Sequence, residues 1–324
     1  MSRLCPVTGF VLARFLWPAK RFIQLPSTFP RQVVEIATVP IILKRRDRSL
    51  DRENPSRVSG GPAPTSHSSA FRVVPVVLLL LMVHFGRDVT NAQSPELVTD
   101  RPDQTESATV VAGGLVQVEM GYLFARDGGV DRYEVPGTLV RVGLGGRTEL
   151  RVGHTGVAGG AEGRGAGDST LGAKFNLIGR ADGWLPELAI LGGVSLPTGD
   201  HGFSSSGVDP SFLFSLAYEL SPRLSFGANV GSAWESSSEG SGREATFLYS
   251  LVLGGGVTER LGVFLELFGD WLTTGANATG VSVDGGFTFL LADLVQFDLY
   301  VGRGLRGIAD DAFIGTGLSF RLPR

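Results

Sequence analysis

The chain has 324 residues, including 46 glycines and a single cysteine, and its formal net charge is −3. Residues 1–92 carry 13 Lys and Arg against 5 Asp and Glu, a net of +8, whereas residues 93–324 carry 16 against 27, a net of −11. The acidic part lacks the clustered cations that binding nucleic acid requires, and Cys5 lies outside it, so that part offers no thiolate metal site. We therefore exclude a nucleic-acid partner and expect no metal and no cofactor.

The first 92 residues are expected to contribute nothing to the folded product. Residues 1–70 contain scattered Arg, eight Pro and no clear hydrophobic period, so we expect a disordered leader or a misassigned start of translation. Residues 71–92 read as a cleaved signal peptide, with Arg72 before an apolar run over 73–85 and the small residues Thr90 and Ala92 before the expected cut. The alternative is a membrane anchor, but this run of 13 residues is shorter than the roughly 20 that a spanning helix needs.

Residues 93–112 form a polar segment ahead of the first expected strand. It contains the charged residues Asp100, Arg101, Asp103 and Glu106, and it is too polar to cross lipid. One hypothesis makes it a periplasmic segment or a plug inside a barrel lumen, with Arg101 pairing with lumen acids. The alternative is a disordered tail.

From residue 113 to residue 324 the apolar residues follow a period of two, which is typical of strands whose side chains alternate between two faces. In the first run Val116, Val118 and Met120 share one face, and Gln117 and Glu119 share the other. Most runs are close to the roughly 9–11 residues that cross a bilayer at a tilt. About twelve strands are expected, over 115–125, 132–144, 147–154, 169–178, 185–197, 210–220, 223–234, 244–257, 261–272, 281–290, 294–303 and 312–322.

The connections between these runs alternate between tight turns and longer polar loops, such as those expected over 155–168 and 198–209. This asymmetry is typical of up-and-down antiparallel barrels, whose short turns face the periplasm and whose long loops face outward. Hydrocarbon cannot hydrogen-bond an unpaired backbone, so a sheet in a membrane has to close. We predict an all-β transmembrane β-barrel over 113–324 in the bacterial outer membrane, among lipid and lipopolysaccharide. The alternative is a secreted β-sandwich or soluble barrel, which would pack its apolar face inward.

Charged side chains recur on the face opposite the apolar one, and we expect them to line the lumen. In an open lumen, neighbouring cations and anions would create a transverse field that tunes solute passage. In a closed lumen they would pair across strands and fill the barrel. The candidates are Glu119, Arg141, Glu149, Arg151, Lys174, Glu187, Glu219, Glu266, Asp270, Asp284 and Asp298.

The last expected strand carries a further signal. Gly315, Leu318 and Phe320 have a spacing that resembles the C-terminal sorting signal of bacterial outer-membrane barrels, although four residues follow Phe320. This resemblance implies that the barrel-assembly machinery is a partner through the C-terminal strand.

Several short motifs together resemble the meta-pathway phenol-degradation transporter family. They are the TDRPD run at 99–103, the GLVQVEMGY run at 114–122, the LGAKF run at 171–175 and the LPTGD run at 196–200. The resemblance covers nearly all of 97–322. It implies an outer-membrane β-barrel that helps hydrophobic or aromatic compounds to cross the membrane.

The sequence thus predicts a channel that passes small hydrophobic or aromatic solutes by passive diffusion. One alternative is a structural or adhesion barrel without transport. A second is an outer-membrane lipid hydrolase, for which His154 near the end of the third expected strand would be the residue to test. No Gly-x-Ser-x-Gly elbow, His-Glu-x-x-His motif or Walker lysine occurs in the sequence, so we do not expect an enzyme.

Overall fold

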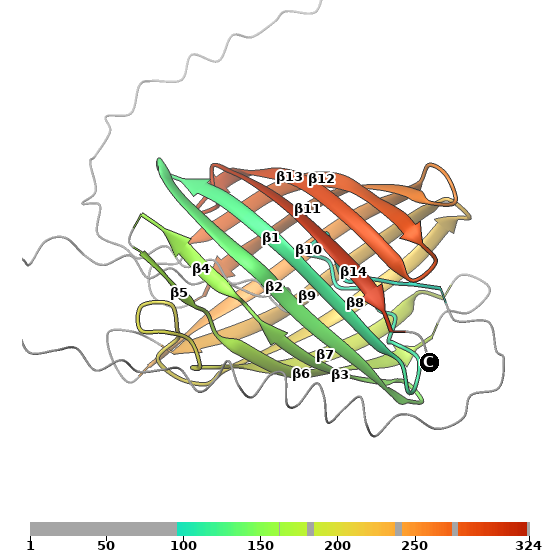
Figure 1. Ribbon diagram of the computed structural model, residues 1–324, viewed down its shortest axis with the longest axis horizontal. Helices are drawn as coiled ribbons and strands as arrows, with labels where there is room; N and C mark the ends of the chain where they lie inside the picture. The colour runs from blue at the N-terminus through green and yellow to red at the C-terminus, as the bar shows by residue number, and fades with distance from the viewer. Residues whose placement is uncertain (1–95, 162, 180–184, 237–241, 274–277, 323–324) are drawn as a thin grey trace, which may run out of the picture.

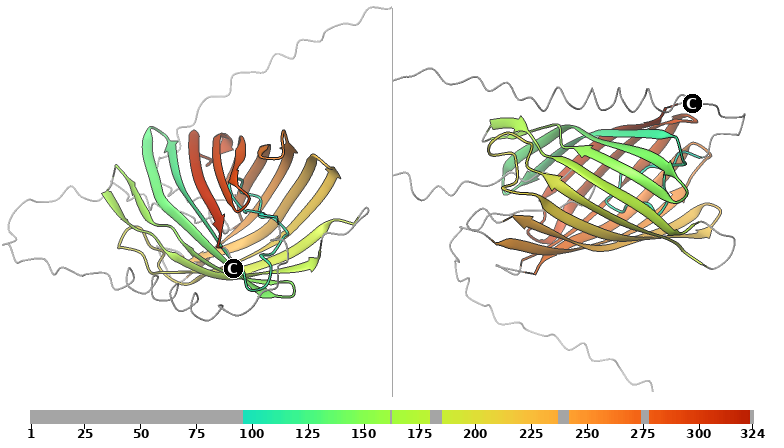
Figure 2. Two further views of the ribbon diagram at one scale, coloured as in Figure 1. Left: turned by 45° about the vertical axis from the view of Figure 1, so that its right-hand side comes forward. Right: turned by 90° about the horizontal axis from the view of Figure 1, so that it is seen from below.

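The computed structural model describes residues 96–322 except 162, 180–184, 237–241 and 274–277 (Figure 1). The expected leader and signal peptide lie outside the described residues. The chain forms one antiparallel sheet that closes on itself, because the first strand pairs with both the second and the last. The strands are strongly tilted around a common interior, as both views in Figure 2 show.

Fourteen strands make up this sheet. Their bounds are β1 Val116–Asp127, β2 Val130–Gly145, β3 Thr148–His154, β4 Val157–Gly160, β5 Gly163–Ala166, β6 Ser169–Ile178, β7 Glu187–Leu196, β8 Asp209–Ser221, β9 Leu224–Ser236, β10 Arg243–Gly256, β11 Leu261–Leu272, β12 Thr279–Ala292, β13 Val295–Gly307 and β14 Ala312–Arg321. Twelve of them form the closed circuit, and β4 and β5 extend it beside β2. The prediction of a closed antiparallel barrel of about twelve strands is confirmed.

The extension made by β4 and β5 corrects the expectation that 155–168 is a loop without strands. β2 has 16 residues but β3 only seven, so part of β2 extends beyond β3 and pairs with β4 instead. The ladder is interrupted between β3 and β4 opposite Pro136, which has no backbone N–H to donate. The chain passes this point at Gly156 with a positive φ of 81°, and a Cβ there would lie only 2.3 Å from the Pro136 carbonyl oxygen. The glycine-rich sequence of this hairpin has too few side chains to show a period.

At one end of the barrel, which we call the turn end, the connections 146–147, 222–223, 257–260 and 293–294 have two to four residues each. At the other end, the loop end, the connections 155–168 and 197–208 are longer, although the turn 128–129 between β1 and β2 has only two residues. β1 begins and β14 ends at the turn end, where the Leu322 backbone N–H donates to the Val116 carbonyl oxygen at 2.9 Å. The described residues contain no helix long and apolar enough to span a membrane.

The distribution of side chains is inverted relative to a water-soluble protein. The interior holds buried charged and polar residues, including Arg141, Lys174 and Glu266, each at most 1% exposed. Large apolar residues instead point outward from the middle of the strands, among them Phe175, Phe214, Leu251, Leu265, Val301 and Ile314. A contiguous exposed apolar surface of this kind is stable only in contact with lipid, so the sheet is built to sit in a bilayer.

The outward apolar surface gives the first prediction. Leu265 lies in the middle of β11 and is 60% exposed, so Leu265→Arg would place a cation in the hydrocarbon. We expect the substitution to lower the free energy of unfolding in lipid vesicles by about 2–4 kcal/mol. Urea unfolding of the barrel in vesicles measures this change.

The matched control is Glu259→Arg, in the exposed turn between β10 and β11, which should leave the unfolding free energy nearly unchanged. Equal unfolding curves for the two variants would mean that this face does not contact lipid tails.

Candidate functional site

The barrel interior is occupied by residues 96–115, which we call the interior segment. Its cyan trace lies inside the ring of strands in Figure 1. The segment rises from the turn end beside β1, where Gln117 Nε2 donates to the Val98 carbonyl oxygen at 2.8 Å. It then crosses the lumen and returns to the turn end beside β2, where the Gly114 backbone N–H donates to the Gly143 carbonyl oxygen at 2.8 Å.

Asp100 anchors the segment to one side of the wall. Its carboxylate accepts hydrogen bonds from Lys174 Nζ at 2.9 Å and from Arg151 at 2.5 Å, and it forms an ion pair with Arg141 at 3.1 Å. The three cations project from β6, β3 and β2 and are almost completely buried. Burial by itself would raise the pKa of Asp100, but the three cations outweigh it and hold that pKa well below its ordinary value. Asp100 is therefore bound as a carboxylate.

Arg101 anchors the segment to another part of the wall, on the other side of β1. Its guanidinium donates two hydrogen bonds to Asp298 of β13, at 3.2 and 3.0 Å, and lies 5.9 Å from the centre of the Tyr300 ring. Two glycines that face each other across β1 and β14, Gly121 and Gly317, provide the space for it. A Cβ at either glycine would lie within 2.6 Å of a guanidinium atom. The guanidinium therefore occupies a space, which we call the glycine cradle, that any residue larger than glycine at either position would fill.

The backbone of the segment is also bonded around the wall. Glu119 accepts hydrogen bonds from the backbone N–H groups of Asp100 and Arg101, each at 3.0 Å. Further bonds run from Gln104 N to Glu266 at 2.7 Å, from Glu106 N to Asn229 at 2.6 Å, from Val111 N to Glu149 at 2.7 Å, from Ser215 to Glu106 O at 2.6 Å and from Asn176 to Ala108 O at 3.0 Å. The segment has no regular secondary structure, so the wall supplies the hydrogen bonds that its backbone cannot make internally.

Glu106 shares the cations that bind Asp100. It accepts two hydrogen bonds from Arg151, at 2.8 and 2.9 Å, and forms an ion pair with Lys174 at 3.4 Å. Burial, together with the neighbouring Asp100 carboxylate, raises the pKa of Glu106 to about 8 against the opposing effect of Arg151 and Lys174. The charge of Glu106 therefore changes near pH 8, and burial together with Glu266 also raises the pKa of Asp103 in the same segment well above its ordinary value.

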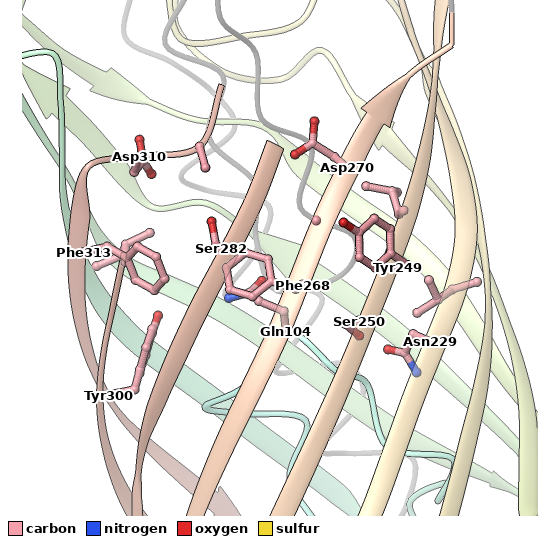
Figure 3. Close-up of a pocket in the computed structure, with 15 residues that line it drawn as sticks. Gln104, Asn229, Tyr249, Ser250, Phe268, Asp270, Ser282, Tyr300, Asp310 and Phe313 are labelled. Carbon is pink, nitrogen blue, oxygen red and sulfur yellow. The ribbon is translucent and has the colours of Figure 1, made fainter. Parts of the chain in front are cut away.

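A pocket lies between the interior segment and the loop end (Figure 3). Gln104 of the segment contributes to it, and polar groups come from Asn229, Ser250, Ser282, Asp270 and Asp310. Its apolar lining consists of Leu123, Leu213, Leu248, Phe268, Ala309 and Phe313, with Tyr300 beside them. The rings of Phe268 and Phe313 meet edge to face at 6.0 Å between centroids. A mainly apolar pocket with a few polar groups suits a small organic solute.

Most of the charged residues expected in the lumen lie buried in the barrel interior. Eight are almost fully buried, namely Glu119, Arg141, Glu149, Arg151, Lys174, Glu266, Asp284 and Asp298, and Asp270 is 7% exposed beside the pocket. Glu187 is half-buried and accepts hydrogen bonds from Thr109 and Asn176, whereas Glu219 is exposed near the turn end of β8. Of the segment residues, Asp100, Arg101 and Glu106 are buried and Asp103 is half-buried.

Sequence reasoning missed the neutral residues of the interior. Asn176, Ser215, Asn229 and Ser250 hold the segment but carry no charge to single them out. The apolar pocket residues did leave a signal, because Leu213 and Phe268 break the alternation on the polar face of their strands. In β8 and β11 these two apolar residues on the lumen face therefore mark the pocket.

The sequence matches a family model described as "Putative MetA-pathway of phenol degradation" over residues 99–322, more than two thirds of the chain. The chain belongs to this family. The resemblance that the short motifs indicated is thereby confirmed. No curated protein sequence gives a significant match.

A solved structure shares the fold. The COG4313 outer membrane channel from Pseudomonas putida F1 gives a TM-score of 0.52 at 13% sequence identity, covering 72% of this chain and 100% of that one. The NanC porin gives a TM-score of 0.47 at 12% identity, covering 64% of this chain and 100% of that one. The fold and the outward apolar surface place the protein in the bacterial outer membrane, in contact with lipid and lipopolysaccharide.

The glycine cradle gives the second prediction. Gly121→Val would fill the space of the Arg101 guanidinium and separate it from Asp298, and breaking a buried ion pair costs about 3–5 kcal/mol. We expect the interior segment to become more accessible. In a Cys5→Ser, Gln104→Cys background, a charged thiol reagent should then label residue 104 about tenfold faster or more.

The control is Gly192→Val on β7, where a Cβ would meet open space. If Gly121→Val and Gly192→Val give the same labelling rate, the cradle does not hold the segment.

Glu106 gives a third prediction, on pH. The pKa of its carboxyl is about 8 when the segment is bound and near 4.5 when the segment is free, so the contribution of Glu106 to binding of the segment is fully present below pH 4.5 and is lost as the pH rises through about 8. We expect the single-channel conductance of the barrel in planar bilayers to rise several-fold between pH 5 and pH 9. Glu106→Gln, which cannot ionise, should flatten this rise, and an unchanged pH profile in that variant would contradict the assignment.

Proposed function

We propose that the protein is an outer-membrane channel that passes small hydrophobic or aromatic solutes by passive diffusion, with the interior segment as its plug. The single observation that carries this proposal is the interior: a polar barrel lumen contains a separate, irregular segment, held by ion pairs and hydrogen bonds instead of a packed apolar core. Such contacts can exchange with water when the segment moves.

The pocket near the loop end supports the solute class. Its walls include Leu123, Leu213, Phe268 and Phe313, and it lies on the side of the segment from which a solute would arrive from outside the cell. An aromatic ring would bury apolar surface there, and a hydroxyl group could reach the polar groups beside it. The description of the family, which refers to phenol degradation, agrees with this class.

The charged lumen would shape the passage of solutes. Arg141, Arg151 and Lys174 lie on β2, β3 and β6, whereas Glu266, Asp284 and Asp298 lie on β11, β12 and β13. Because these strands belong to different parts of the circuit, the cations and anions would create the transverse field expected for a selective lumen.

The two alternative functions, a structural barrel and a lipid hydrolase, agree less well with the contents of the barrel interior. A barrel with only a structural role has no need of a separate segment bound by buried charges. For the hydrolase, His154 faces the lipid side of β3, and its Nδ1 accepts a hydrogen bond from the Gly156 backbone N–H at 2.8 Å. We therefore propose that the protein is not an enzyme. Lipid turnover that disappears in His154→Ala would contradict this.

Assembly is expected to depend on the last strand. Leu318 and Phe320 of β14 point to the lipid side, and Phe320 packs against the cluster of Val118, Val140 and Val142. We propose that the barrel-assembly machinery recognises this strand.

Deletion of residues 97–110 tests the channel proposal as a fourth prediction. Removing the segment should raise the single-channel conductance by about tenfold or more, because the deletion frees the cross-section of a twelve-stranded lumen. Heat-modifiable migration on gels checks that the deleted barrel folds. A folded barrel that conducts no ions with or without the segment would favour the structural alternative.

A further inference from the structure

The three cations that bind Asp100 lie close enough together to repel one another, so they need anionic groups between them. Arg141 and Arg151 lie directly opposite each other on β2 and β3, and like charges in this register repel. Lys174 of β6 joins them and is completely buried. The strand pairing fixes this cluster of positive charges, which we call the cation cluster, and the repulsion is relieved only by carboxylates placed between its members.

The wall itself supplies too few carboxylates. Glu119 and Glu149 are the wall acids hydrogen-bonded to the cation cluster, through Arg141 at 2.9 and 2.8 Å and through Arg151 at 3.0 Å. Three cations and two carboxylates leave a net charge of +1 when the interior segment is absent. A net charge enclosed by a lipid-embedded barrel attracts a counter-ion more strongly than the same charge in bulk water. The cluster therefore has room for a further anionic group, and Asp100 of the interior segment fills it, with Glu106 of the same segment bound beside it to Arg151 and Lys174.

The donors around Asp100 match a carboxylate. One oxygen accepts from Lys174 and from both the backbone N–H and hydroxyl of Ser107, and the other accepts from Lys174 and Arg151 and lies 3.1 Å from Arg141. Guanidinium and ammonium groups in this number hold a carboxylate by short, charge-assisted hydrogen bonds. Only the Ser107 donors belong to the segment, so most of the site stays in place when the segment leaves.

A solute arriving from the loop end would meet the apolar pocket first. Phe268, Phe313 and Leu123 would contact an apolar ring, and Gln104 places the interior segment against the same pocket. Gln104 is only four residues along the chain from Asp100. A solute in the pocket would therefore contact the interior segment four residues along the chain from the residue that occupies the cation cluster.

We propose that Arg141, Arg151 and Lys174 form a recognition site for the carboxylate of a small aromatic or apolar acid. Asp100 occupies this site in the resting channel, and the carboxylate of the solute replaces it and releases the segment. The inference rests on the proposed channel function and narrows its substrate class from apolar solutes in general to those that carry a carboxylate.

The test uses the full-length barrel in planar bilayers at constant pH and ionic strength. Benzoate is the probe, and benzyl alcohol is the neutral compound of similar size and shape. Added benzoate should raise the conductance several-fold and saturate, whereas benzyl alcohol at the same concentration should have no such effect. Equal responses to the two compounds would overturn the recognition site.

Three substitutions test whether the effect of benzoate on the conductance arises at the cation cluster. Asp100→Asn weakens the internal competitor, so it should lower the half-maximal benzoate concentration. Lys174→Met removes a donor of the site, so it should raise that concentration about tenfold or more. Arg126→Met removes a cation that pairs with Asp131 in an exposed position and should leave the concentration unchanged. A benzoate response that is the same in all four proteins would overturn the proposal.

The outcomes separate this inference from the channel function. A barrel that conducts, and opens equally well for benzyl alcohol and benzoate, remains a channel without carboxylate recognition. A barrel that folds, by heat-modifiable migration, and conducts under none of these conditions contradicts both proposals. Labelling of Gln104→Cys provides a second readout, because benzoate should speed it in the Cys5→Ser background and should fail to do so in Lys174→Met.

Discussion

The structure depends on one constraint: hydrocarbon offers no hydrogen-bonding partner, so every backbone N–H and C=O of the sheet must be paired within it. Pairing of β1 with both β2 and β14 meets this constraint by removing the free edges of the circuit. Closure then forces alternate side chains into two environments, lipid outside and an enclosed lumen inside. The apolar residues face the lipid, and the charged residues face one another across the lumen.

A lumen lined with charge has to be neutralised, and the interior segment is the way this chain does it. Asp100 and Arg101 are neighbours in sequence but pair with different parts of the wall, Asp100 with the cation cluster on β2, β3 and β6 and Arg101 with Asp298 on β13. Replacing a buried pair of this kind with apolar residues often stabilises a protein, so buried ion pairs alone are weak evidence of a stabilising role. Their use here is better explained by a segment that has to bind firmly and also leave.

The sequence predicts the strands well, because lipid imposes its pattern on every one of them. The expected runs 169–178 and 261–272 have the same bounds as β6 and β11. The hairpin of β4 and β5 could not be predicted, because its pairing comes from the excess length of β2 and the break at Pro136 and not from a side-chain period. The alternation also identifies which charges face inward. The partners of these charges depend on the registers of distant strands, so Asp298, 197 residues from Arg101, could not be chosen in advance over Glu266 or Asp284.

The central claim is that residues 97–111 are bound inside the barrel by the wall, and hydrogen–deuterium exchange of the protein in lipid nanodiscs tests it most directly. The backbone N–H groups of Asp100, Arg101, Gln104, Glu106 and Val111 donate to wall side chains. The account predicts that these amides exchange far more slowly than those of an unstructured peptide, although none of them belongs to a strand or helix. Exchange at the rate of an unfolded chain across the whole segment would contradict it.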